Sequence, residues 1–307
     1  MKILHSTDII EESTIATIGF FDGVHLGHEY LLRDLRSEAR CRGLKTLVVT
    51  FSNHPRLLFD PQCGLRFLTL TDEKLHLIEL SYVDYCLVLP FTFELAKLTS
   101  ADFMMKLHDS FGVRAILVGY DHHFGSDCES GFCEYVEFGK NVGIELLRCD
   151  VFSVKDVNVS SSKARKAIEE GDIELANELL GYQYRIHGKV VHGHQVGRTI
   201  GFPTANLDIS PLKILPCCGV YQVLATLDDN ASYNGLLNIG HRPTIDNGDI
   251  SVEVYLDNFE GNLYDSLLQL QLVRFIRYEQ KFDSLSALKA QLHIDLQLLK
   301  SYIKKVE

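Results

Sequence analysis

The sequence predicts an α/β domain with a parallel sheet, followed by a domain of antiparallel strands that ends in a helix. Up to residue 152, apolar strand-like runs alternate with helical patterns, which is typical of a parallel sheet covered on both faces. Past Tyr182, short β-rich runs are separated by clusters of Gly, Pro, Asn and Asp, which indicates an antiparallel barrel or sandwich. Because 307 residues are enough for two domains of ordinary size, we place the boundary between residues 182 and 183.

The first domain is expected to alternate strands and helices in the order of the chain. Ligands of such sheets bind beyond the carboxyl ends of the strands. A longer helical segment at 160–180, interrupted at Gly171-Asp172 and stopped by Gly181, closes the domain. The predicted strands cover residues 14–20, 46–51, 84–91, 114–119 and 144–152. The predicted helices cover residues 28–42, 72–80, 100–111 and 131–141.

The second domain is expected to contain five strands and a final amphipathic helix over residues 284–305. The strands are predicted at residues 185–191, 220–227, 232–239, 251–256 and 267–276. One face of the final helix is apolar, and we expect it to pack against the barrel. That face carries Leu285, Leu288, Leu292, Leu296 and Leu299.

Composition limits the classes of function. With 46% hydrophobic and 23% charged residues the chain is globular, and a net charge of −11 argues against a broad nucleic-acid surface. Its eight cysteines are scattered without zinc or disulfide spacing, so we expect reduced thiols in a cytoplasmic protein. No apolar stretch is long enough to span a membrane, so no membrane partner is expected. The sequence does not predict an oligomeric state.

Residues 19–28, Gly-Phe-Phe-Asp-Gly-Val-His-Leu-Gly-His, lie between a predicted strand and a predicted helix. The start of a helix presents unpaired N–H groups and a positive dipole end, which favour an anion. His25 and His28 add imidazole donors on one side, and Gly23 and Gly27 leave room for a phosphate near the backbone. The combination indicates a phosphate site.

Two plainer interpretations of this segment remain. Asp22-Gly23 on its own is an ordinary tight turn, and two histidines at a helix start are usually surface residues. A metal site is the weaker alternative, because no third ligand lies at suitable spacing beside the histidines.

The segment resembles the His-x-Gly-His motif of nucleotidyltransferases, and with its flanking residues it looks like the adenylyltransferase half of bifunctional riboflavin kinase/FAD synthetases of the prokaryotic type. Three further segments fit the resemblance in order: residues 50–55, Thr-Phe-Ser-Asn-His-Pro, residues 119–125, Gly-Tyr-Asp-His-His-Phe-Gly, and residues 159–165, Val-Ser-Ser-Ser-Lys-Ala-Arg. The serine run alone would be interpreted as helix capping. The resemblance implies a Rossmann-like nucleotidyltransferase fold for this half.

The resemblance also implies that this half transfers AMP from ATP to FMN, giving FAD and pyrophosphate without a covalent enzyme intermediate. His25 and His28 would stabilise charge on the transferring phosphate, and Phe51, His54 and Pro55 would face the flavin. The chain departs from the usual pattern at His122, where phenylalanine is more common. The implied ATP-binding residues are Gly19, Phe20, Asp22, Gly23, His25, His28, Asp121, Ser161, Ser162 and Arg165.

Residues 188–206 form the second dense segment and end in Gly-Phe-Pro-Thr-Ala-Asn. A glycine-rich hairpin alone is usually a plain turn. After Pro203, however, Thr204 and Asn206 present oxygens on one face of an extended chain, as Mg²⁺ with phosphate ligands requires. The run resembles the riboflavin kinase motif, which implies that ATP binds at Gly193, Gly197, Arg198, Gly201, Thr204 and Asn206, with Mg²⁺ at Thr204 and Asn206.

Glu253 lies in a predicted strand and matches the catalytic glutamate of these kinases, although a glutamate in a strand is usually only solvated. Arg277 and Phe282 match the part of the family that covers the flavin. The chain departs from the usual pattern at Asp265, where glycine is common. Asp265 tolerates positive φ better than most residues, so we expect the fold to be kept and the kinase rate to be affected.

The resemblance covers nearly the whole chain. It implies a bifunctional enzyme that makes FMN from riboflavin with ATP and Mg²⁺ and then FAD from FMN with a second ATP. Two alternatives remain open: an adenylyltransferase with an impaired kinase, and a flavin-binding regulatory module without catalysis.

Overall fold

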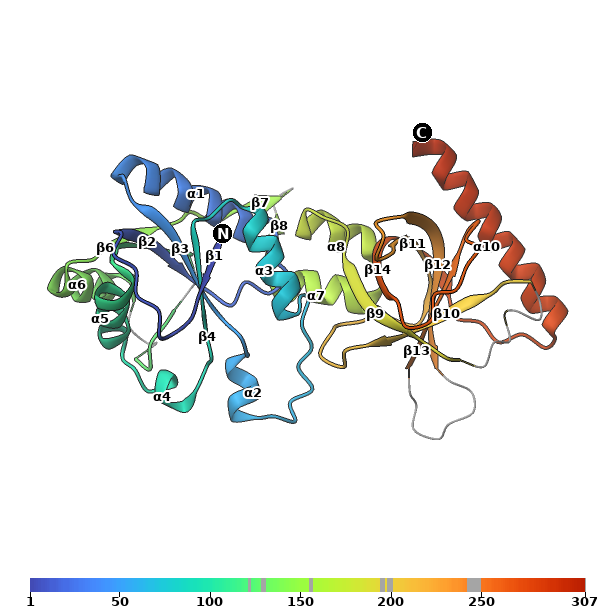
Figure 1. Cartoon of the computed structure of the whole chain (residues 1–307), viewed down its shortest axis with the longest axis horizontal. Coiled ribbons are helices and arrows are strands. Elements are labelled where there is room, and N and C mark those ends of the chain that lie inside the picture. The colour runs from blue at the N-terminus through green and yellow to red at the C-terminus, as the bar shows by residue number, and fades with distance from the viewer. Residues whose placement is uncertain are drawn as a thin grey trace. The chain divides into compact units, whose positions relative to one another are not determined.

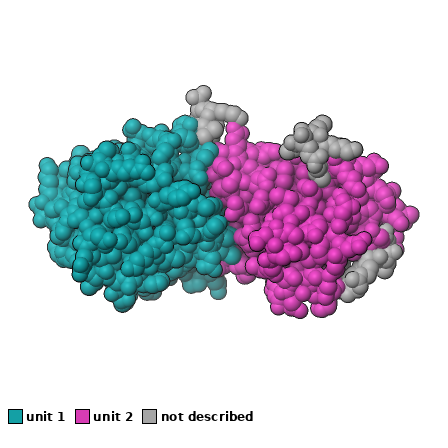
Figure 2. Space-filling model, turned by 45° about the horizontal axis from the view of Figure 1, so that its top comes forward, with its two compact units in different colours: residues 1–161 teal, residues 162–307 magenta. Residues whose placement is uncertain are grey.

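The computed structural model describes residues 1–120, 123–127, 131–154, 157–193, 197, 201–241 and 250–306. The chain divides into two compact units, residues 1–161 and 162–307 (Figures 1 and 2). Each unit has its own sheet, and the two sheets are of different kinds.

The first unit contains a six-stranded sheet whose strands are all parallel, which confirms the predicted class (Figure 1). The first strand, β1 (Lys2–Leu4), was not predicted because three residues are too few to show a pattern. In sheet order the strands are β1, β4 (Tyr85–Leu89), β3 (Lys45–Phe51), β2 (Thr14–Ile18), β5 (Val113–Val118) and β6 (Glu145–Arg148).

Helices cover both faces of this sheet. Successive strand residues point to opposite faces, so Ile15 packs with one helical layer and Ala16 with the other. The first layer consists of α1 (Leu26–Arg42) and α3 (Thr71–Leu80), and the second of α5 (Ser100–Phe111) and α6 (Phe132–Val142). The shorter elements, α2 (Pro55–Phe59), α4 (Phe93–Ala96), β7 (Ser153–Val154) and β8 (Val157–Asn158), were not predicted.

The second unit is a closed antiparallel barrel, which settles the choice between barrel and sandwich. The strand β9 pairs with both β10 and β14, so the sheet has no free edge. Around the barrel the order is β10 (Thr204–Ile209), β13 (Ile250–Leu256), β12 (Ser232–His241), β11 (Gly219–Thr226), β14 (Leu267–Tyr278) and β9 (Arg185–Val191). The prediction included each of these strands except β10.

The predicted helical segment at 160–180 forms α7 (Ser161–Glu170) and α8 (Ile173–Leu180), separated at Gly171-Asp172 as expected. The helix α8 packs on the barrel, where the Asn177 amide donates to the carbonyl of Leu272 at 2.9 Å. This contact explains why the second compact unit begins at the start of α7 and includes both helices. The domain boundary at residues 182 and 183 stays a prediction.

The final helix, α10 (Leu285–Val306), packs on the barrel through its predicted apolar face. Leu299 is fully buried against Val220 and Leu236, with Leu296 partly buried beside them. The prediction is wrong for Leu285, which is 57% exposed because it is the first residue of the helix.

Candidate active sites

The turn between β2 and α1 holds an uncommon backbone conformation. Phe21, Gly23 and Val24 have φ values of 56°, 80° and 35°, a region that is costly for phenylalanine and valine. Two hydrogen bonds to Thr69 hold the turn in place. The backbone N–H of Gly23 donates to Thr69 Oγ1 at 2.9 Å, and Asp22 Oδ1 accepts the N–H of Thr69 at 3.1 Å. Asp22 is only 4% exposed. Its side chain therefore organises the turn.

The turn brings the two predicted histidines together. His25 is the N-cap of α1, and its Nδ1 accepts the backbone N–H of His28 at 3.3 Å. The two rings stack with centroids 3.7 Å apart and planes 13° apart. Because Nδ1 of His25 is an acceptor, the neutral ring carries its proton on Nε2. In this tautomer, Nε2–H is the hydrogen-bond donor of the His25 ring.

Lys74 lies beneath this turn and was not predicted. It is 2% exposed on α3, donates from Nζ to the carbonyl of Phe51 at 2.7 Å and lies 4.3 Å from the centre of the Phe20 ring. Burial lowers the pKa of Lys74 to about 8, against the opposing attraction of Asp22. The hint in the sequence was its position one turn before Ile78, on the buried face of the helix.

A cavity of about 250 Å³ lies at the carboxyl ends of β2, β3 and β5. The structure brings the predicted flavin-facing residues to it. His54 caps α2 by accepting the N–H of Arg56 at 3.1 Å, and its ring meets that of Phe20 edge-on at 4.7 Å. Phe20, which the resemblance assigned to ATP, also lines this cavity. The lining includes Phe20, Phe51, His54, Pro55, Phe91 and His123.

Of the predicted phosphate-binding residues on α7, Ser161 forms a hydrogen bond to the turn between β2 and α1. The hydroxyl of Ser161 donates to the carbonyl of Asp22 at 2.8 Å, so the start of α7 touches the turn that holds the histidines. Ser162 and Arg165 lie further along α7, in the second compact unit. Asp121 and His122 lie outside the described residues.

The barrel holds a second cavity, of about 320 Å³. Five of the predicted kinase residues line it: Gly197, Thr204, Glu253, Arg277 and Phe282. Glu253 on β13 is paired in register with Asn206 on β10 and with Asn238 on β12. The hydroxyl of Thr204 donates to Glu253 Oε2 at 3.1 Å. Strand register therefore places Asn206, Glu253 and Asn238 side by side, and the hydrogen bond adds Thr204 to the group.

The glycine-rich segment lies close to this group. The backbone N–H of Phe202 donates to the carbonyl of Gly197 at 2.9 Å, and a Cβ at position 197 would collide with the Phe202 carbonyl. Gly193 lies against the amide of Asn206 in the same way, whereas Gly201 has open space around it. Arg198 lies outside the described residues, as do 194–196 and 199–200.

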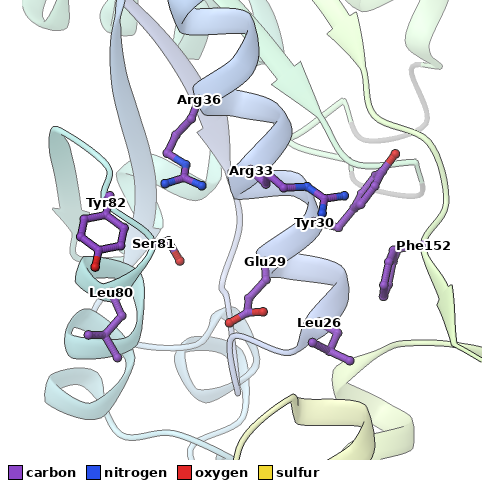
Figure 3. Close-up of a pocket in the computed structure, with 9 residues that line it drawn as sticks. All are labelled: Leu26, Glu29, Tyr30, Arg33, Arg36, Leu80, Ser81, Tyr82 and Phe152. Atoms are coloured by element: carbon purple, nitrogen blue, oxygen red, sulfur yellow. The ribbon is translucent and has the colours of Figure 1, made fainter.

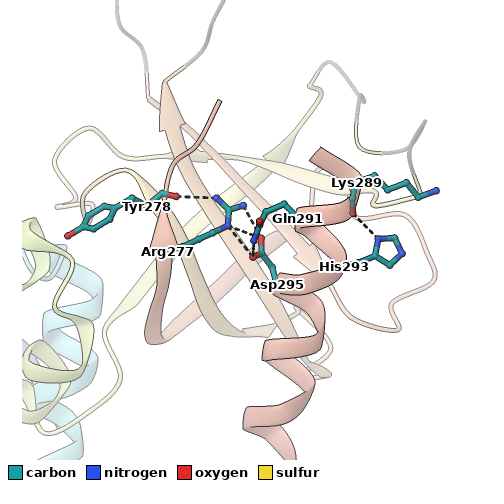
Figure 4. Close-up of polar contacts among 6 residues, drawn as sticks. All are labelled: Arg277, Tyr278, Lys289, Gln291, His293 and Asp295. Carbon is teal, nitrogen blue, oxygen red and sulfur yellow. Dashed lines mark hydrogen bonds and ion pairs between the residues drawn. The ribbon is translucent and has the colours of Figure 1, made fainter. Parts of the chain in front are cut away.

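Arg277 and Phe282 line the barrel cavity as predicted, but Arg277 is already paired (Figure 4). Its Nε and Nη2 donate to the carboxylate of Asp295 at 2.9 to 3.1 Å, and Gln291 donates to the same carboxylate at 2.9 Å. Asp295 is fully buried. It stands among leucines on the apolar face of α10, which was the hint that it has a buried partner.

Asp265 has the left-handed backbone that was expected at this position, with φ of 67°. Its carboxylate pairs with Lys189 Nζ at 2.8 Å, and this hydrogen bond lowers the pKa of Asp265. Both side chains are more than half exposed, so the pair contributes little to stability.

The described residues contain no metal-ligand cluster, no membrane-spanning helix and no disulfide. None of their His, Cys, Asp and Glu side chains form a group of three that could hold a metal ion. None of their helices combines the length and the hydropathy of a membrane-spanning segment. Their seven cysteines are all free.

Comparisons with known proteins show a family for each half of the chain. The FAD synthetase family model matches residues 8–163, and the riboflavin kinase family model matches residues 180–303. A bifunctional riboflavin kinase/FMN adenylyltransferase of Haemophilus influenzae is 35% identical over 97% of each chain. The protein of the same description from Escherichia coli K12 is 37% identical over 93% of this chain and 91% of its own.

A solved structure described as a macrolide-efflux protein from Streptococcus pneumoniae has the same fold, with a TM-score of 0.89 and 28% identity over 97% of this chain and 98% of its own. The described fold is therefore found over nearly the full length of another protein. From the two family models and the full-length relatives, this chain belongs to the bifunctional riboflavin kinase/FMN adenylyltransferase family.

Proposed function

We propose that the chain catalyses two successive reactions at two separate sites. The barrel phosphorylates riboflavin with ATP to give FMN, and the α/β domain transfers AMP from a second ATP to FMN to give FAD and pyrophosphate. The observation that carries the proposal is that each cavity is lined by residues of the family motifs found in its own half: Phe51, His54 and Pro55 in the first, and Gly197, Thr204 and Glu253 in the second. We assign residues 1–182 to the adenylyltransferase domain and 183–307 to the kinase domain.

In the adenylyl transfer, a phosphate oxygen of FMN forms a bond to the α-phosphorus of ATP, and pyrophosphate leaves. His25, through Nε2–H, and His28 stabilise the charge that develops on the transferring phosphate. Positioning and electrostatics suffice, because a phosphate monoester is already anionic near neutral pH. Asp22 acts by holding the turn, with Gly19 and Gly23 leaving the backbone open to ATP.

The other substrate contacts of this site follow the family motifs. Ser161, Ser162 and Arg165 hold the phosphates of ATP, since arginine offers a fork of donors. Asp121 contacts the nucleotide. The flavin ring enters the apolar cavity and contacts Phe51, His54 and Pro55, which favours a flat aromatic substrate over a sugar or a peptide.

In the kinase reaction, a riboflavin hydroxyl oxygen forms a bond to the γ-phosphorus of ATP, ADP leaves, and Glu253 accepts the hydroxyl proton. The Thr204 hydroxyl orients Glu253 through the 3.1 Å hydrogen bond. Gly193, Gly197, Arg198 and Gly201 lie along the ATP phosphates. Phe282 covers the flavin, and Arg277 forms one wall of the cavity while paired with Asp295.

The donor set of the barrel fits Mg²⁺. Thr204 and Asn206 offer neutral oxygens beside Glu253, and Mg²⁺ prefers oxygen ligands completed by phosphates. When bound, the ion neutralises phosphate charge during transfer. Thr204 and Asn206 would hold it.

We place the enzyme in the cytoplasm, because scattered free thiols stay reduced there and because its proposed substrates include ATP. The chain has a net charge of −11, which disfavours nucleic acids and anionic membranes as partners. Its partners are therefore small-molecule substrates.

The test is incubation of the full chain with riboflavin and MgATP, with FMN and FAD followed by chromatography. FMN should appear first and FAD later. Conversion of added FMN without any conversion of riboflavin would show an adenylyltransferase with an impaired kinase. Tight flavin binding without turnover of either substrate would show a regulatory module and overturn the proposal.

A further inference from the structure

A third cavity, of about 340 Å³, lies on the outer side of α1 in the first unit (Figure 3). We call it the arginine cavity. Its walls come from α1, from the C-terminal end of α3 and from the segment before β7. Neither proposed reaction uses its residues, which include Glu29, Tyr30, Arg33, Arg36, Tyr82 and Phe152.

Two cationic side chains in this cavity have no acidic partner. Among the described residues neither Arg33 nor Arg36 forms an ion pair, and the buried Nε of Arg36 has no hydrogen-bond partner. Arg33 instead lies over the ring of Tyr30, 5.1 Å from its centre. In a chain with a net charge of −11, two such guanidinium groups at one cavity form a local site for an anion.

Aromatic side chains enclose the same space. The rings of Tyr30 and Phe152 stack at 5.2 Å on one side, and Tyr82 stands on the other (Figure 3). Tyr82 is 81% exposed and has φ of 54°, which is strained for a bulky residue. A ring so exposed is open to contact with a flat ligand.

Glu29 also lines the cavity, and its carboxylate lies apart from the guanidinium groups of Arg33 and Arg36 (Figure 3). A carboxylate accepts N–H or O–H donors and repels a second anion. The ligand must therefore carry its negative charge at one end and a hydroxyl or amine elsewhere.

We propose that the arginine cavity binds a phosphate ester of an aromatic nucleoside-like molecule. Its phosphate contacts Arg33 and Arg36, a hydroxyl or amino group donates to Glu29, and its flat ring contacts the aromatic walls. Adenine mononucleotides and FMN share this chemistry. Leu26 lines the cavity and directly follows His25, so the bound ligand contacts the first turn of the helix that positions the histidines.

The experiment is equilibrium dialysis of labelled AMP with the full chain in the absence of Mg²⁺. Arg36→Gln removes a predicted phosphate contact, and Arg40→Gln is the matched control, since Arg40 is exposed in the last turn of the same helix and does not line the cavity. We expect wild type and Arg40→Gln to bind one more AMP per chain than Arg36→Gln, or to bind it at least about tenfold more tightly. Arg33→Gln should repeat the loss.

Two further arms identify the ligand. FMN in place of AMP, with the same loss in Arg36→Gln, would assign the site to flavin phosphates. Ribose 5-phosphate should compete at least about tenfold less well than AMP, because it lacks the ring. Equal competition by ribose 5-phosphate, or equal binding of both AMP and FMN by Arg36→Gln and Arg40→Gln, would overturn the proposal. Retained turnover in Arg36→Gln keeps this result separate from the two proposed reactions.

Discussion

The histidine turn of the first unit and the Thr204–Glu253 group of the barrel are built by different means. In the turn, three residues with positive φ and the buried contacts of Asp22 and Thr69 fix where the histidines lie. In the barrel, the register of regular strands sets Glu253 beside Asn206 and Asn238. The turn therefore depends on side-chain contacts with a residue remote in sequence, Thr69. The barrel site depends on regular backbone pairing between antiparallel strands.

The largest effect is expected for Glu253→Gln. The amide keeps the shape and the hydrogen bond from Thr204 but cannot accept the substrate proton, so FMN formation should fall by about 10²- to 10⁴-fold. Conversion of FMN to FAD should be unchanged. Separate assays of the two half-reactions check this, and a parallel loss in both would break the distinction between the sites.

His28→Ala should have the reverse effect. Removing this imidazole takes away charge stabilisation on the transferring phosphate, so FAD formation from FMN should fall by about 10²- to 10³-fold while FMN formation stays unchanged. Because the His25 ring stacks on His28, some loss also comes from a less ordered His25. Retention of FAD formation in the variant would count against the role of the turn.

Lys74→Met tests the buried support of the first site by its pH dependence. The folded chain releases the Lys74 proton near pH 8, whereas the unfolded chain keeps it to about pH 10.5. Between these pH values the unfolded state binds more protons than the folded state. As the pH rises from about 8 to about 10.5, the unfolding free energy of the wild type should therefore rise relative to that of Lys74→Met, by up to about 3 kcal/mol. Below pH 8 the difference should be constant.

Urea unfolding of both proteins from pH 7 to 10.5 measures this difference. If the wild type's unfolding free energy falls relative to that of Lys74→Met as the pH rises, or does not change, the lowered pKa of buried Lys74 is contradicted.

The smallest effect is expected for Asp265→Gly in the barrel. Glycine adopts φ of 67° without strain, and the exposed ion pair with Lys189 that is lost contributes little, so the variant should be slightly more stable than the wild type. Asp265→Asn, which keeps the backbone preference and loses only the charge, is the control. A thermal melt that shows Asp265→Gly less stable than Asp265→Asn would contradict this account.

Periodicity predicted most of the fold, and the motifs predicted His54 at the first cavity and Thr204 and Glu253 at the second. Strand β1 was too short, and β10 directly follows Pro203 in a segment interpreted for its ligand chemistry. Lys74 and Asp295 were missed for another reason. Each is a charged residue on the buried face of a helix, and only the tertiary fold supplies the Phe51 carbonyl and Arg277 that pair with them.

The central claim is that the two sites work independently, and mixing the two single variants tests it most directly. His28→Ala and Glu253→Gln, each alone, should convert riboflavin to FAD at least about 10²-fold more slowly than the wild type. Together in one solution with MgATP they should restore most of that loss, because FMN made by the barrel of one is adenylylated by the other. Failure of the mixture, with each variant still active in its intact half-reaction, would show that FMN does not pass between chains and would contradict two independent sites.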